Sequence, residues 1–305
     1  MPPAPALAVR EVVKRFYGIT AVDGVSFDVA AGTVFGLLGP NGAGKTTIIR
    51  ILLGILGADS GTCTYRGAPI DRRARRQFGY LPEERGLYQK TRLRETLVYL
   101  GRLRGLSAAD ASSQVDSHLE RFGLQDYGQK PIRALSKGNQ QKVQFIAAVA
   151  HRPSLAVLDE PFAGLDPVNQ LALKELLREL QAEGTTILLS THRMEQVEQL
   201  CQAICLINRG RVVLAGELAQ VKERWGGSDR GGPSVEVVFA GQVPDGVEQL
   251  LDVTETRDTT VAGRPRQGLP ETMKGLVELG PIAEFRVREP SLEEIFIAAV
   301  EAGRV

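Results

Sequence analysis

The sequence predicts an α/β fold, and three features support this prediction. Short apolar runs typical of buried strands occur at 32–39, 154–160 and 185–192. Apolar residues at helical spacing separate the last two runs, which predicts a strand, helix and strand unit. The run 25–30 adds a strand near the start of the chain. The expected product is a parallel sheet with a β-rich N-terminal part.

A block of helical pattern interrupts this alternation. Apolar residues recur at helical spacing in 94–105 and 107–124, and the hydroxyl of Ser107 can cap the second helix. We therefore expect a helical insertion at about 81–135.

A change in composition separates a small C-terminal part from the rest. Residues 226–234 concentrate Gly, Ser and Pro, which is typical of a flexible connector. A capping box from Ser291 to Glu294 begins a helix near the end of the chain. The predicted domains are a larger domain at 1–225, a linker at 226–234, and a small α+β domain at 235–305.

Length and charge exclude several classes of protein. The 305 residues are enough for a substantial core, and 37 basic against 36 acidic residues leave a net charge of only +1. Residues 235–305 hold 7 basic and 13 acidic residues, so no nucleic acid partner is expected. No apolar run approaches the roughly 18 residues of a membrane span. Three cysteines and a start without a signal segment predict a cytoplasmic protein.

The segment GPNGAGKT has the spacing of a phosphate-binding loop. It follows an apolar strand and precedes a helical run, so backbone N–H groups and the positive end of a helix can face phosphates. Lys45 would reach the β and γ oxygens of a nucleotide, and Thr46 would ligate Mg²⁺. A glycine-rich turn before a helix is the alternative. The predicted nucleotide-binding residues of this segment are Gly39, Pro40, Asn41, Gly42, Ala43, Gly44, Lys45, Thr46 and Thr47.

Two adjacent carboxylates end the strand at 154–160. Because ligands bind at the carboxyl ends of parallel strands, Asp159 would hold Mg²⁺ and Glu160 would orient or deprotonate an attacking water. Such a pair alone is also typical of a helix cap or a solvated turn. Its combination with Lys45 favours a site that binds a nucleotide and Mg²⁺, with Lys45 and Glu160 as catalytic residues.

Three further motifs, in a fixed order, carry a family resemblance. LSKGN at 135–139 lies upstream of LAVLDEP, and AGLDP at 163–167 and STH at 190–192 follow it. Over about residues 6–222 the chain resembles the nucleotide-binding subunits of ATP-binding cassette (ABC) transporters. The resemblance implies a P-loop NTPase cassette with a β-rich N-terminal subdomain and a helical insertion, plus a small C-terminal α+β domain.

The resemblance also implies a head-to-tail homodimer with two ATP molecules at its interface. The family's signature loop, LSGGQ, corresponds to 135–139, and this sequence departs from it at Lys137 and Asn139. Ser136 and Gly138 are retained and would contact the γ-phosphate of the nucleotide bound by the other copy. Asp166 belongs to the D-loop, which would link the two sites.

Two more positions correspond to residues with a role in the family. His192 matches the switch histidine that contacts the γ-phosphate, and a polar residue satisfied at a strand end is the alternative. Tyr17 lies where the family keeps an aromatic ring to stack on adenine. A partly buried strand aromatic is the alternative for Tyr17.

Glu83 is the clearest departure from the family pattern, because the family has a glutamine at this position of its Q-loop. A glutamate oxygen can still ligate Mg²⁺, but an ionised glutamate cannot donate a hydrogen bond to water. The segment leads into the helical insertion, which in the family contacts the membrane partner. Glu83 is therefore our candidate for a catalytic and coupling residue, with a solvated loop acid as the alternative.

Three functions follow from the resemblance. The first is the ATPase of an exporter, since the C-terminal segment is similar to that of ABC-2-type subunits of the sodium-extrusion and drug-efflux group. It requires a separate transmembrane permease subunit and a place on the inner face of the cell membrane. The second is a soluble ABC ATPase acting on the ribosome or nucleic acid, but the chain has one cassette and no long coiled-coil heptads. The third is a non-enzymatic switch, against which Glu160 and His192 argue.

Overall fold

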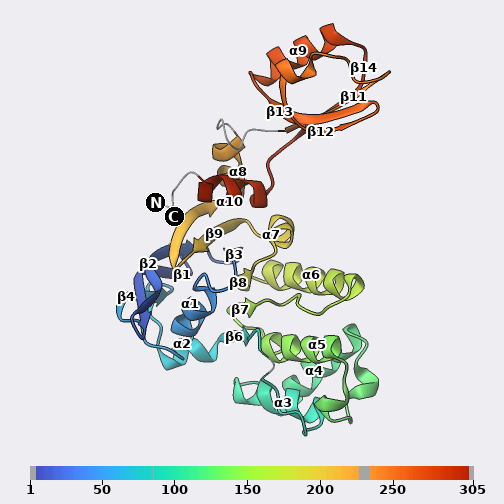
Figure 1. Ribbon diagram of the computed structural model, residues 1–305. Helices are drawn as coiled ribbons and strands as arrows, with labels where there is room; N and C mark the ends of the chain where they lie inside the picture. The colour runs from blue at the N-terminus through green and yellow to red at the C-terminus, as the bar shows by residue number, and fades with distance from the viewer. Residues whose placement is uncertain (1–4, 85, 227–233, 302–305) are drawn as a thin grey trace. The chain divides into compact units, whose positions relative to one another are not determined.

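The computed structural model describes residues 5–84, 86–226 and 234–301 (Figure 1). These residues form two compact units, which divide between Glu217 and Leu218. The predicted linker at 226–234 lies outside the described residues except at its two ends. The division precedes the predicted boundary, and the domain limits 1–225, 226–234 and 235–305 stay a prediction.

A six-stranded sheet forms the centre of the first unit, in the order β10-β9-β3-β8-β7-β6. Five strands are parallel, and β10 pairs antiparallel with β9 at one edge. Every residue of β3, β7 and β8 is buried, including the polar residues at the ends of β7 and β8, and the apolar runs of these strands predict such burial. The strands are β3 (Val34–Leu38), β6 (Phe78–Leu81), β7 (Leu155–Asp159), β8 (Thr186–Thr191), β9 (Ala203–Asn208) and β10 (Arg211–Glu217).

The N-terminal part of the first unit is β-rich, as predicted. It forms an antiparallel sheet in the order β2-β1-β4-β5. Its apolar side chains share one core with α1 and with central strands, and Phe27 stacks on Phe35 of β3. The strands are β1 (Leu7–Phe16), β2 (Ile19–Val29), β4 (Ser60–Tyr65) and β5 (Ala68–Pro69).

Helices connect the central strands, and a helical segment lies between β6 and β7 (Figure 1). Ser107 caps the second helix of this segment, because its Oγ accepts a hydrogen bond from the Asp110 N–H at 3.1 Å. No helix in the described ranges is both long and apolar enough to cross a membrane. The helices of the unit are α1 (Lys45–Leu52), α2 (Arg72–Arg76), α3 (Leu93–Leu103), α4 (Ala108–Arg121), α5 (Lys137–Val149), α6 (Pro167–Ala182) and α7 (Met194–Leu200), with 3-10 turns at Gln125–Tyr127 and Ile132–Ala134.

The second unit is a small α+β structure with an antiparallel sheet in the order β12-β13-β11-β14. Alternate residues of β11 enter its core, as the period of a half-buried strand requires. The predicted capping box is confirmed: the Glu294 N–H donates to Ser291 Oγ at 3.2 Å, and the Ser291 N–H donates to Glu294 Oε2 at 2.8 Å. The elements are α8 (Leu218–Gly226), β11 (Ser234–Phe239), a 3-10 turn (Val247–Gln249), β12 (Leu251–Arg257), β13 (Thr260–Pro265), α9 (Leu269–Leu279), β14 (Ile282–Arg288) and α10 (Leu292–Glu301).

Candidate functional site

Three neighbouring parallel strands bring the candidate site together at their carboxyl ends. In the pairing of β3 with β8, Leu38 lies opposite Thr191, and in the pairing of β7 with β8, Asp159 lies opposite Ser190. The loop after β3, the carboxylates at the end of β7 and His192 after β8 therefore leave the sheet at the same level. This edge is where ligands of parallel α/β sheets bind.

The phosphate-binding loop depends on glycine at two close approaches of the backbone. Gly44 precedes α1 with φ of +107°, and a Cβ there would lie 2.6 Å from the Ala21 carbonyl oxygen. Gly39 has φ of +149°, and its Cβ would lie 2.1 Å from the Ile207 carbonyl oxygen. No side chain caps the start of α1, so its first backbone N–H groups are available to an anion.

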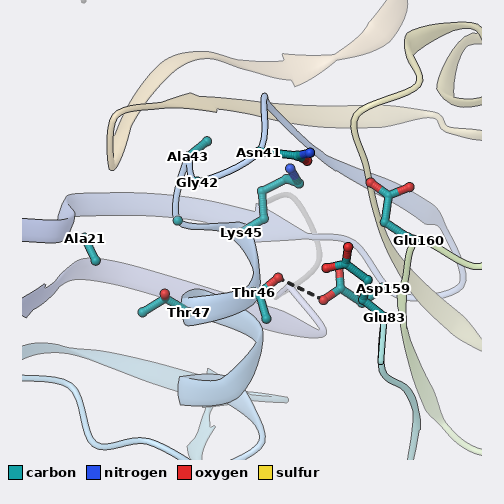
Figure 2. A pocket seen from close by; sticks show the side chains of 11 residues that line it. Ala21, Asn41, Gly42, Ala43, Lys45, Thr46, Thr47, Glu83, Asp159 and Glu160 are labelled. Carbon is teal, nitrogen blue, oxygen red and sulfur yellow. Dashed lines mark hydrogen bonds between the residues drawn. The ribbon is translucent and has the colours of Figure 1, made fainter. Parts of the chain in front are cut away.

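A pocket of about 370 Å³ lies in front of this loop (Figure 2). Residues from the loop, from the end of β7 and from the segment after β6 line it together, as the sequence predicts. The glycine-rich turn without a ligand site is therefore not the better interpretation of this loop. The lining residues are Ala21, Asn41, Gly42, Ala43, Gly44, Lys45, Thr46, Thr47, Glu83, Asp159 and Glu160.

Lys45 is the buried cation of the pocket, with 6% of its surface exposed. Its Nζ donates to the carbonyl oxygens of Gly39 at 2.7 Å and Pro40 at 3.1 Å. Burial lowers the pKa of the Lys45 ammonium, and the negative charges of Glu160 and nearby carboxylates oppose this effect. An anionic ligand in the pocket would add the negative charge that a desolvated ammonium requires.

Asp159 and Thr46 form the oxygen-rich side of the pocket. The Thr46 hydroxyl donates to Asp159 Oδ2 at 3.0 Å, and Glu83 lies on the same side (Figure 2). Asp159 is 1% exposed, and burial raises the pKa of its carboxyl. This set of oxygens fits Mg²⁺, which proteins hold with one or two carboxylates while phosphates and waters complete the shell. No cluster of three or more His, Cys, Asp or Glu side chains in the described ranges would hold a metal by itself.

Glu160 is held by the end of β8. Its backbone has φ of +49°, an uncommon value for a residue with a side chain, and its N–H donates to the Ser190 carbonyl at 2.9 Å. Its Oε1 lies 2.9 Å from the His192 backbone N and 2.6 Å from His192 Nδ1. Its Oε2 accepts from the Thr191 hydroxyl at 3.0 Å. With Glu160 8% and Asp159 1% exposed, the solvated-turn interpretation of the pair is wrong. The helix-cap interpretation is also wrong for the next helix, because Asp166 caps α6.

Seven predicted residues lie outside the pocket lining, namely Tyr17, Gly39, Pro40, Ser136, Gly138, Asp166 and His192. Ser136 caps α5 by accepting from the Asn139 N–H at 3.2 Å, and Asp166 caps α6 by accepting from the Asn169 N–H at 3.0 Å. Gly138 lies against the D-loop, because a Cβ there would be 3.3 Å from the Gly164 carbonyl. The roles of Ser136, Gly138 and Asp166 toward a second copy stay predictions.

Tyr17 lies at the tip of the hairpin between β1 and β2. Phe16 pairs with Ile19, and the two-residue loop between them has positive φ at both Tyr17 (+47°) and Gly18 (+84°), as a tight hairpin requires. The Tyr17 side chain is fully exposed, so the partly buried aromatic interpretation is wrong. Stacking on adenine stays a prediction.

Sequence reasoning missed two residues of the site. Ala21 lines the pocket, but a small apolar residue in a strand carries no chemical signal. Thr191 binds Glu160, but within the STH motif only His192 has a predicted role. The sequence did contain a signal for Thr191, because a polar residue ends the strand that precedes His192.

Together, the fold and the pocket define a nucleotide-binding cassette of the P-loop class. The family model described as "ABC transporter" matches residues 22–163. An "Uncharacterized ABC transporter ATP-binding protein YhaQ" of Bacillus subtilis (strain 168) is 42% identical over 97% of this chain and 99% of its own length. The chain therefore belongs to the ABC transporter family, among its ATP-binding proteins.

Two further relatives extend this assignment. A "Daunorubicin resistance ATP-binding protein DrrA3" of Streptomyces coeruleorubidus is 35% identical over 96% of this chain and 95% of its own length. A solved "Structure of ATP binding subunit of ABC transporter" is 33% identical, with a TM-score of 0.69 over 73% of this chain and 95% of that chain. The ABC-2-type exporter group named in the sequence analysis is thus represented among the relatives.

Replacing the buried charge tests the electrostatics of the pocket. Because burial raises the pKa of Asp159, its ionised form is disfavoured in the folded state. We expect Asp159→Asn to stabilise the ligand-free protein at pH 7 by about 1 kcal/mol, or about 2–4 °C in thermal midpoint. The gain should fade as the pH falls toward the ordinary carboxyl pKa of 3.8. Thermal unfolding at several pH values measures both.

The exposed Asp126→Asn variant is the control for this prediction, and we expect it to leave the midpoint unchanged. A loss of stability in Asp159→Asn at pH 7 would mean that Lys45 and the hydroxyl of Thr46 more than compensate the buried charge.

Proposed function

We propose that this chain is the ATP-hydrolysing subunit of an exporter. The contact that carries the proposal is the one between Glu160 and the end of β8, because it keeps a carboxylate beside the phosphate-binding loop. In the family, ATP-binding subunits work with membrane permease components, and the name of one relative refers to daunorubicin resistance. The alternative of an ATPase acting on the ribosome or nucleic acid is not favoured by these relatives.

The charged side chains of the pocket and the Thr46 hydroxyl each have a role in this proposal. Lys45 and the first N–H groups of α1 bind the β- and γ-phosphates, and Thr46, Asp159 and Glu83 hold Mg²⁺ directly or through water. Mg²⁺ neutralises phosphate charge when bound. Glu160 accepts the proton of a water whose oxygen bonds to the γ-phosphorus, while the bond from that phosphorus to the ADP oxygen breaks.

The proposal includes a head-to-tail homodimer. Ser136 and Gly138 at the exposed start of α5 bind the γ-phosphate held by the other copy, and Asp166 links the two sites. His192 contacts the γ-phosphate bound by its own copy, and Tyr17 stacks on adenine from its exposed position. One copy then holds half of each site, so hydrolysis requires two.

The proposal places the subunit in the cytoplasm, bound at the inner face of the membrane through a separate permease. The helical segment supplies a surface for that contact, since it exposes large apolar side chains at Tyr88, Tyr99 and Leu103. Glu83 lines the nucleotide pocket and lies between β6 and α3 in the sequence. We therefore assign it the coupling role.

Removing the proposed base tests the reaction. We expect Glu160→Gln to bind Mg·ATP as the wild type does but to hydrolyse it about 100-fold more slowly or worse, because an amide cannot accept the proton. The variant should also accumulate as an ATP-dependent dimer. Phosphate release and light scattering measure these effects, and near-normal phosphate release would remove Glu160 from its assigned role.

Mixed dimers test the contact in trans. We expect Ser136→Ala in one copy to impair the nucleotide site assembled with the other copy, with a loss of about tenfold or more in its hydrolysis rate. Site-resolved hydrolysis, with one phosphate-binding loop disabled, measures this. Ser107→Ala is a matched control, because Ser107 also caps a helix of the helical segment through the same type of bond. Loss confined to the mutated copy's own site would contradict the trans arrangement.

Charged substitutions on α3 test the permease contact. We expect the double variant Tyr99→Glu and Leu103→Glu to lose at least about tenfold of the permease that co-purifies from membranes, while basal ATP hydrolysis persists. Met273→Glu with Val277→Glu is the control, since these residues form an exposed apolar pair at the same spacing on α9. Loss of the permease in the α9 variant alone would place the contact elsewhere.

A further inference from the structure

A base that activates water must be held within hydrogen-bond reach of it, and Glu160 is difficult to hold. A glutamate side chain has several rotatable bonds, and fixing it costs conformational entropy. Its backbone also adopts a left-handed conformation, with φ of +49°. The position of the Glu160 carboxylate therefore depends on the groups that bind its two oxygens.

Thr191 binds one of those oxygens from a rigid position. Its side chain is fully buried at the end of β8, and its β-branched shape restricts rotation about χ1. The Arg193 N–H donates to its Oγ1 at 3.1 Å. The hydroxyl proton is then directed to Glu160 Oε2 at 3.0 Å, and an ionised carboxylate there can only accept it.

His192 binds the other oxygen from a less restricted position. Its side chain is 52% exposed and reaches Glu160 Oε1 through Nδ1. In the proposed reaction the His192 ring turns to the γ-phosphate. Glu160 Oε1 then keeps only the hydrogen bond from the His192 backbone N–H at 2.9 Å and can also accept one from the attacking water. The bond from Thr191 to Oε2 does not obstruct that water and does not depend on the histidine ring.

We propose that Thr191 is a positioning residue for Glu160. Its hydroxyl holds Oε2 in place, so that Oε1 faces the water when His192 moves away. The inference rests on the proposed function, because it assigns Thr191 a role in the hydrolysis that Glu160 performs. Thr191 itself is fully buried and does not line the pocket.

Three substitutions separate positioning from packing. Thr191→Val removes the hydroxyl and keeps the shape, and Thr191→Ala removes it in a smaller side chain. Thr191→Ser keeps the hydroxyl and loses only the methyl group. Thr185→Val is the matched control. Thr185 lies just before the other end of β8, and its buried hydroxyl donates to the Pro153 carbonyl at 3.1 Å, away from the pocket.

The experiment measures kcat and KM for Mg·ATP and the thermal midpoint of the full-length chain. We expect Thr191→Val and Thr191→Ala to lower kcat about tenfold, with KM changed less than about twofold, because only the base is misplaced. Thr191→Ser should restore kcat to within about threefold of the wild type. Thr185→Val should lower the midpoint as much as Thr191→Val does and leave kcat unchanged. In the Glu160→Gln background, Thr191→Val should cause no further loss.

Several results would overturn the inference. They are a wild-type kcat in both Thr191→Val and Thr191→Ala, a loss in Thr191→Ser as large as in Thr191→Val, or an equal loss in Thr185→Val. These results would leave the proposed function intact as long as the wild type hydrolyses Mg·ATP and Glu160→Gln does not. A wild type without hydrolysis in the same assay would overturn the proposed function, and the inference with it.

Discussion

The register between β3, β8 and β7 is the constraint on which the rest of the site depends. Because these strands are parallel and adjacent, their ends fix the phosphate-binding loop, the two carboxylates and the Ser190–Arg193 segment at one level. Side chains alone would not hold these groups together, since Lys45 and Glu160 are far apart in sequence and carry high conformational entropy. The buried hydrogen-bonded ladder of the sheet supplies the rigidity that the polar groups lack.

Burying charge at this edge has an energetic cost. Burial raises the pKa of Asp159 and lowers the pKa of Lys45, so both charged forms are disfavoured. Hydrogen bonds to the Thr46 hydroxyl and to the loop carbonyls offset only part of the cost of burying these charges. A bound metal ion and polyphosphate would bring the complementary charges. The ligand-free site is thus arranged for what it binds at the expense of its own stability.

Much of the fold and of the pocket was predictable from the sequence for physical reasons. Apolar runs in strands and a fixed glycine spacing are local signals, and Lys45, Asp159 and Glu160 do lie together as those signals predict. Ala21 and Thr191 were not predicted as site residues, because their roles arise only from the pairing of strands that are distant in sequence. The division of the chain before α8 likewise depends on contacts between elements. These contacts cannot be predicted from the amino-acid composition of residues 226–234.

The left-handed backbone of Glu160 restricts how this site can change by mutation. Few amino-acid types adopt a φ near +49° without strain. A glycine at position 160 would relieve the strain, but it would also remove the carboxylate. A one-residue deletion in β8 would turn Thr191 to the opposite face and displace His192 from Glu160 in one step. Insertions and deletions are therefore expected to accumulate in the turns at the amino ends of these strands. In a homologue whose strand length differs, we expect ATP hydrolysis to be lost.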